Sequence, residues 1–138
     1  ISKKNIKNKE ITINKIVKGK KNILLKIDIE NTEYTILDDI IKNKKKIVFL
    51  IIEFHSIKKN LKKINKFVSQ IKDLKIIHMH GNNINKIDKH GYPYALEISF
   101  INSKIIKISK KKNSQHYPIL GLDYPSVRRN KDIKLLFK

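Results

Sequence analysis

The chain has 138 residues, enough for one domain with a buried core, and a formal net charge of +20. It contains no cysteine, which excludes disulfides and thiolate metal sites. No apolar run reaches the roughly 20 residues of a membrane helix, and no signal peptide is visible at the start, so a cytoplasmic protein without a membrane span is expected. The first residue is Ile, so we expect a processed chain or a fragment.

The positive charge by itself suggests a nucleic-acid partner, because basic surfaces release counterions from phosphate backbones. However, 30 of the 32 basic residues are Lys, and only Arg128 and Arg129 carry the guanidinium fork that base and phosphate recognition favours. The chain is also rich in Ile and Asn, which share A/T-rich codons with Lys. Coding bias on solvated faces is the preferred explanation, and a nucleic-acid or anionic-surface binding module stays open as an alternative.

The first elements that the sequence predicts lie between residues 11 and 30. Residues 11–17 (ITINKIV) alternate in polarity and fit either an edge strand or a short turn of helix. Residues 23–30 (ILLKIDIE) fit a strand with apolar side chains at the odd positions. Because side chains alternate across a strand, Lys26, Asp28 and Glu30 share its other face. This strand therefore ends in two carboxylates.

A helix and a buried strand are expected next. Asn31 or Thr32 caps a helix that runs to about residue 42, and Glu33 falls in its first turn, where the helix dipole favours an anion. Residues 46–55 (KIVFLIIEFH) contain an unbroken apolar run. Such a run is typical of a strand that is covered on both faces in a parallel sheet.

The second half of the chain is expected to add one helix and three strands. Ser56 caps a helix over 57–72, which has apolar residues at helical spacing, and residues 75–80 (KIIHMH) form a strand. Residues 94–101 (YALEISFI) and 104–108 (KIIKI) are separated by Asn-Ser and predict a hairpin.

The order of these elements predicts an α/β layer with a mainly parallel sheet. The rest of the chain, residues 109–138, contains Pro and Gly and is expected to be irregular, with one further short strand allowed at 133–137.

Polar pairs close each of the three strands that are expected to be parallel. Parallel strands joined by helices place their C-terminal ends on one edge of the sheet, where ligands of open α/β sheets bind. The members of each pair are two residues apart, so each pair shares one face of its strand. We therefore expect the pairs to converge on one site. The pairs are Asp28 and Glu30, Glu53 and His55, and His78 and His80.

Carboxylates and imidazoles in one place have two chemical uses. They act as general bases on a substrate hydroxyl, or they bind a divalent cation such as zinc, iron or manganese rather than calcium. Their spacing matches no specific zinc signature, so no metal ligand is assigned, although a divalent metal stays possible.

Five further polar residues need an interpretation. Asn82 and Asn83 fit either substrate hydrogen-bonders or ordinary turn residues. Glu97 lies in an apolar strand and, if it faces inward, needs a partner, for which a neighbouring His is a candidate. His90 and His116 lie in expected loops and fit surface residues.

Four segments resemble parts of FkbM-type methyltransferases. Residues 24–37 (LLKIDIENTEYTIL) resemble the family signature, in which Lys-Ile-Asp-Val/Ile-Glu-Gly-x-Glu precedes an apolar helix. Residues 50–55 (LIIEFH) resemble the next strand of the family, which closes on Glu and often His. Residues 11–17 resemble its preceding Thr-Leu-Asp segment, with Asn14 in place of Asp, and residues 78–100 are similar to its C-terminal region. The signature positions that match are Lys26, Ile27, Asp28, Ile29, Glu30 and Glu33.

The resemblance implies an α/β fold with a Rossmann-like class I methyltransferase sheet, mainly parallel with a C-terminal antiparallel strand. It implies transfer of a methyl group from S-adenosylmethionine to a hydroxyl of a small-molecule or glycan acceptor. The family's glycine-rich cofactor loop is missing, since the four glycines form no G-x-G turn between a strand and a helix, and Asn31 replaces the signature Gly. We therefore expect residues 1–138 to be one partial domain, incomplete at its N-terminus, and assign no cofactor-binding residue.

The predicted catalytic group consists of Asp28, Glu30, Glu53 and His55. Asp28 is the central polar residue, Glu30 orients substrate or a cation, and Glu53 or His55 accepts a proton. A metal-dependent hydrolase built on the same His/Glu cluster stays open as an alternative. The predicted substrate contacts are His78, His80, Asn82 and Asn83.

Overall fold

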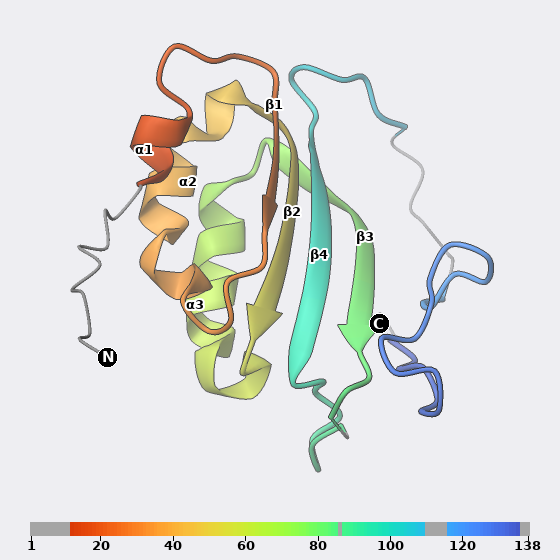
Figure 1. The fold of residues 1–138 in the computed structure, drawn as a ribbon. Helices are drawn as coiled ribbons and strands as arrows, with labels where there is room; N and C mark the ends of the chain where they lie inside the picture. Colours follow the sequence, from red (N-terminus) through yellow and green to blue (C-terminus); the bar gives the residue numbers. More distant parts are fainter. Residues whose placement is uncertain (1–11, 86, 110–115, 136–138) are drawn as a thin grey trace, which may run out of the picture.

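A computed structural model describes residues 12–85, 87–109 and 116–135. Its centre is a four-stranded sheet in the order β1-β2-β4-β3 (Figure 1). β1 and β2 are parallel neighbours, whereas β4 is antiparallel to both β2 and β3. The sheet is mixed, so the prediction of a mainly parallel, Rossmann-like sheet is wrong. The strands are β1 (Ile23–Ile27), β2 (Ile47–His55), β3 (Leu74–Asn82) and β4 (Ala95–Asn102).

The position of β4 explains this correction. β4 is a largely buried strand, and both of its edges are hydrogen-bonded, one to β2 and the other to β3. No edge is left for a hairpin partner, and residues 104–108 form no strand. The predicted hairpin of 94–101 with 104–108 is therefore wrong, because its first strand pairs with segments far away in the sequence.

The direction of the strands agrees with one part of the prediction, namely that three strands end at the same edge of the sheet. Because β4 is antiparallel to both neighbours, β1, β2 and β3 all run in one direction, and their C-terminal ends lie at the same edge of the sheet. β3 also continues past the predicted end at His80, since Gly81 pairs with Leu96 and Asn82 pairs with Ala95. Asn82 is therefore the residue that β3 brings to this edge.

The helices lie on one face of the sheet (Figure 1). They are α1 (Ile13–Ile16), α2 (Leu37–Asn43) and α3 (Ile57–Gln70), with 3-10 turns at Glu33–Thr35 and Lys44–Lys46.

The N-terminal turns differ in detail from the expectations. Residues 13–16 are a turn of helix rather than a strand, and the Thr12 hydroxyl accepts a hydrogen bond from the Lys15 N–H at 3.4 Å. α2 begins later than expected, since the 3-10 turn that precedes it buries Glu33 completely.

The core lies between this layer of helices and the sheet. Phe67 of α3 sits between two strand residues, with ring centroids 6.0 Å from Phe54 of β2 and 6.4 Å from Phe100 of β4. Both pairs meet edge to face, a favourable arrangement for aromatic rings. All three side chains are almost completely buried. The opposite face of the sheet is more polar, because alternation directs Glu53, Glu97 and the histidines of β3 to it.

The C-terminal segment, residues 116–135, lies beside β3 (Figure 1). Tyr117 and Leu135 form an isolated bridge, which is all that is described of the strand expected at 133–137, because 136 and 137 lie outside the described residues. A Cβ added at Gly81 would lie 3.1 Å from two Ile133 side-chain atoms, so glycine allows this segment to pack closely on β3. Within the described ranges, no helix is long and apolar enough to cross a membrane.

Candidate functional site

A cleft of about 380 Å³ opens at the C-terminal edge of the sheet. Its walls come from the ends of β1, β2 and β3 and from the loop before β4. Polar side chains dominate these walls, as expected for an edge where strands of one direction end. The polar residues include Asp28, Glu30, Glu53, His55, Asn82 and Tyr94.

Three of these residues form a compact group. One side-chain ligand atom each of Asp28, Glu53 and His55 lies within 4.8 Å of the others. Asp28 is exposed, Glu53 is half-buried and His55 is 4% exposed. The geometry thus brings together residues predicted from two different strands. Carboxylate oxygens and imidazole nitrogen are donors that zinc, iron and manganese accept.

A buried carboxylate holds the ring of His55. The Nδ1 atom of His55 contacts Oε1 of Glu33, which has no exposed surface. The Tyr34 hydroxyl donates to the backbone carbonyl of His55 at 2.5 Å. On the cleft side, Nε2 of His55 lies 3.4 Å from Oε2 of the exposed Glu30. The ring is therefore fixed from behind, and its second nitrogen faces the cleft.

The two turns at this edge use left-handed backbone. Glu30 and Asn31 follow β1 with φ of 48° and 71°, and Ser56 follows β2 with φ of 51°. Such conformations cost energy in residues other than glycine and cluster at functional sites. The Ser56 hydroxyl donates to Oδ1 of Asn31 at 2.7 Å, and no cap hydrogen bond from its side chain to α3 is formed. This bond joins the two turns directly.

Tyr94 stands at the rim of the cleft. Its hydroxyl accepts a hydrogen bond from Nδ2 of Asn31 at 3.2 Å. Hydrogen bonds to Asn31 and Ser56 lower the pKa of Tyr94. A second cleft, of about 580 Å³, also borders Tyr94 and has Tyr92 and Pro93 in its walls. Tyr94 thus lies between the polar edge and a larger, more apolar space.

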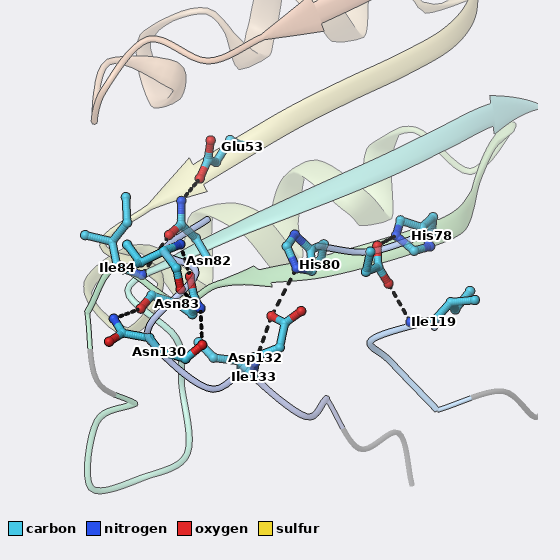
Figure 2. Close-up of polar contacts among 12 residues, drawn as sticks. Glu53, His78, His80, Asn82, Asn83, Ile84, Ile119, Asn130, Asp132 and Ile133 are labelled. Carbon is cyan, nitrogen blue, oxygen red and sulfur yellow. Dashed lines mark hydrogen bonds and ion pairs between the residues drawn. The ribbon is translucent and has the colours of Figure 1, made fainter. Parts of the chain in front are cut away.

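Asn82 and Glu97 both contact neighbours on the polar face of the sheet. Asn82 donates from Nδ2 to Oε1 of Glu53 at 2.9 Å, which leaves Oε2 of Glu53 for other partners (Figure 2). Glu97 accepts a hydrogen bond from the Lys26 ammonium at 3.0 Å. The hydrogen bond and charge of Glu97 raise the pKa of Lys26. The partner of Glu97 is therefore Lys26 and not a histidine.

His78 and His80 contact the C-terminal segment and are not among the residues that line the cleft. Nε2 of His78 lies 2.7 Å from Oδ1 of Asp123, and Nε2 of His80 lies 3.2 Å from Oδ1 of Asp132 (Figure 2). Their side chains are 17% and 16% exposed. Substrate binding by these residues stays a prediction, but their geometry is that of anchors for residues 116–135.

Asn83 is a second anchor for this segment. It is 3% exposed, and its Nδ2 donates to the carbonyls of Val127 and Asn130, both at 3.1 Å. Its Oδ1 accepts the Val127 N–H at 2.8 Å. Figure 2 shows Asn83 and Asn130 facing each other, whereas the neighbouring Asn82 turns toward Glu53. Of the two predicted amides, only Asn82 lines the cleft.

Sequence reasoning did not find the structural role of Glu33. Its place in an expected first helical turn indicated an anion stabilised by the helix dipole, whereas it is buried against His55. The available signal was its position in the segment that resembles the methyltransferase signature. His90 and His116 are exposed, as expected.

The described residues do not fit the cofactor that the resemblance implies. A dinucleotide- or nucleoside-type cofactor needs a glycine-rich turn between a strand and a helix. Gly81 lies within β3, while Gly19, Gly91 and Gly121 lie in turns with positive φ that join no strand to a helix.

No protein-family model, no curated protein and no solved structure matches the chain.

Proposed function

We propose that the cleft is the hydroxyl-acceptor site of an FkbM-type methyltransferase, and that the chain is the C-terminal part of such a domain. One observation carries the proposal. Two of the segments that resemble the family, residues 24–37 and 50–55, include neighbouring strands and supply Asp28, Glu30, Glu53 and His55 to one cleft. A cytoplasmic location belongs to the same proposal.

The side chains of the cleft suit a hydroxyl group. Asp28 and the free Oε2 of Glu53 can accept its hydrogen bond and hold its oxygen in place. His55 is the better oriented of the two candidate proton acceptors, because Glu33 fixes Nδ1 and leaves Nε2 facing the cleft. A positioned base of this kind contributes typically about 10²–10⁴-fold to a rate. Holding the acceptor in line adds a further contribution through proximity.

In this family the methyl group comes from S-adenosylmethionine. Since the chain lacks the glycine-rich turn, the proposal assigns the cofactor to a part of the methyltransferase outside residues 1–138. The neighbouring cleft suits the body of the acceptor, because Tyr92, Pro93 and Tyr94 give it an apolar wall. A sugar or other small hydroxyl compound is the proposed acceptor class.

Transfer of labelled methyl groups tests the proposal. The full-length gene product is incubated with methyl-labelled S-adenosylmethionine and a panel of sugars and small alcohols. We expect transfer by the wild type, a loss of about 10²-fold or more in Asp28→Asn and His55→Gln, and normal transfer by Asp38→Asn, an exposed control on α2. Normal transfer by Asp28→Asn would contradict the assigned site. A full-length coding sequence that encodes no glycine-rich turn between a strand and a helix would contradict the methyltransferase itself.

A metal-dependent hydrolase is a second candidate, favoured by the close approach of Asp28, Glu53 and His55. It differs in a measurable way from the first, because a hydrolase needs a divalent cation and no S-adenosylmethionine. Release of product from model esters or phosphate esters that depends on metal would favour this candidate.

A further inference from the structure

We propose that Asp28, Glu53 and His55 bind one divalent transition-metal ion. Their ligand atoms lie within 4.8 Å of one another, and all three residues sit on the adjacent parallel strands β1 and β2 or directly after them. The set of two carboxylates and one imidazole suits manganese, iron or zinc better than calcium, which prefers oxygen ligands alone.

The arrangement behind His55 supports this assignment. Histidine ligands of metals almost always use their second ring nitrogen to contact a carboxylate or carbonyl, which fixes the ring and raises the basicity of the ligand nitrogen. Here Nδ1 of His55 contacts the buried Glu33, and Nε2 faces the cleft. Asn82 orients Glu53 in a similar way, because it donates a hydrogen bond to Oε1 of Glu53 and leaves Oε2 of Glu53 available to an ion.

The distribution of charge points to a cation as well. Glu33 is completely buried, and its Oε2 has no hydrogen-bond partner in the described part of the chain. Burying a carboxylate that lacks a hydrogen bond to one oxygen costs free energy unless positive charge lies nearby. A cation on Nε2 of His55 would supply such charge through the ring.

The charged side chains around the cleft leave its carboxylates available to a cation. Lys26 interacts electrostatically with Asp28 and Glu53, but its ammonium is bonded to Glu97. Within the described ranges, neither Asp28 nor Glu53 forms an ion pair of its own. The protein carries a net charge of +20, yet this edge collects acidic side chains. Glu30 adds a further carboxylate 3.4 Å from His55.

The ligand atoms need only a small movement to close around an ion. Three ligand atoms at about 2.1 Å from one metal are roughly 3.0–3.6 Å apart. The three atoms of the group lie within 4.8 Å of one another, so inward shifts of about 0.7 Å or less at each ligand are sufficient. Asp28 can move most freely, because its side chain is exposed and it follows the last residue of β1.

The inference goes beyond the proposed function and does not depend on it, because binding needs neither cofactor nor acceptor. If both hold, the ion also changes the role of His55. As a ligand, His55 no longer accepts a proton, and the ion instead lowers the pKa of a hydroxyl bound to it.

Titration of the full chain with Mn²⁺ alone, followed by electron paramagnetic resonance, tests the site. We expect one tight site per chain, with nitrogen coupling from a bound imidazole. Asp28→Asn and Glu53→Gln each should weaken binding at least tenfold, and Glu33→Gln should weaken it about 10–100-fold without changing the stoichiometry. Asp38→Asn and His90→Gln are matched controls on the exposed surface and should bind as the wild type does.

The same experiment can overturn the proposal. Absence of a stoichiometric site, or equal losses in Asp38→Asn and Glu53→Gln, would show diffuse attraction instead of a built site. Absence of nitrogen coupling would exclude His55. Asp28→Asn keeps the test valid if buried variants fail to fold, because Asp28 is exposed and its change should leave the circular dichroism spectrum unaltered. Failure of metal binding leaves the methyl-transfer assay to be judged separately.

Discussion

Glu33 and His55 are 22 residues apart in the sequence and form a buried contact between Oε1 and Nδ1. Glu33 belongs to the 3-10 turn after β1, and His55 is the last residue of β2. Their contact therefore ties the two strand ends that make up most of the cleft. Because Glu33 has no exposed surface and His55 is 4% exposed, the pair also contributes to the stability of this edge.

Glu33→Gln should destabilise the protein by about 1–3 kcal/mol, because a neutral amide replaces the buried carboxylate oxygen that contacts Nδ1 of His55. The free energy of unfolding from urea titration measures this loss. The double variant Glu33→Gln/His55→Gln should lose less than the sum of the two single variants, since their effects are coupled. Additive losses would contradict a direct interaction between Glu33 and His55.

Lys26→Gln should strengthen Mn²⁺ binding. The Lys26 ammonium interacts with the charges of Asp28 and Glu53, so its removal takes away repulsion of the ion. A neighbouring unit charge screened by water changes the binding free energy by roughly 0.6 kcal/mol, about threefold in affinity. Paramagnetic titration measures the change. Lys45→Gln, an exposed control, should have no effect, and weaker binding by Lys26→Gln would contradict the location of the ion.

Asn83→Ala should loosen residues 116–135 while leaving the sheet intact. The change removes three part-buried hydrogen bonds to the backbones of Val127 and Asn130, at a cost of about 1–3 kcal/mol. Hydrogen exchange should become faster in this segment and stay slow in β2 and β4. Lys131→Ala, an exposed change in the same segment, serves as control. Equal acceleration in the sheet would contradict the role of Asn83 as a local anchor.

The sequence supported strands and site residues better than it supported the sheet order. The apolar run in 46–55 and the polar ends of the first two strands predicted β2 and the group of Asp28, Glu53 and His55, because such patterns are local. The position of β4 between β2 and β3 depends on pairing between distant segments, which alternation alone does not specify. For the same reason, local alternation predicts a strand at 104–108, although both edges of the preceding strand β4 are occupied by β2 and β3.

The partners of single polar residues were the least predictable part. The spacing of His78 and His80 predicts that both side chains point into the cleft at the end of their strand. Their carboxylate partners, Asp123 and Asp132, come from a segment more than 40 residues further along the chain. Irregular segments carry no periodic signal that predicts where they dock.

Tyr34 should ionise at a higher pH than an ordinary tyrosine. Burial, assisted by the charge of Glu33, raises its pKa from 10.0 to about 12. The folded protein therefore holds this proton more tightly than the unfolded chain does, so the stabilisation is complete below pH 10 and is lost as the pH rises toward 12. Ultraviolet titration of tyrosinate should show a late component that Tyr34→Phe lacks and the exposed control Tyr124→Phe keeps. A late component that survives in Tyr34→Phe would contradict this assignment.

The central claim is that Asp28, Glu53 and His55 act together as one site at the edge of the sheet. An anomalous difference map from crystals grown with Mn²⁺ tests it most directly. The account predicts one strong peak in the cleft, about 2.0–2.3 Å from a carboxylate oxygen of Asp28, a carboxylate oxygen of Glu53 and Nε2 of His55. A map without a peak in the cleft, or with the ion bound elsewhere on the chain, would contradict the account.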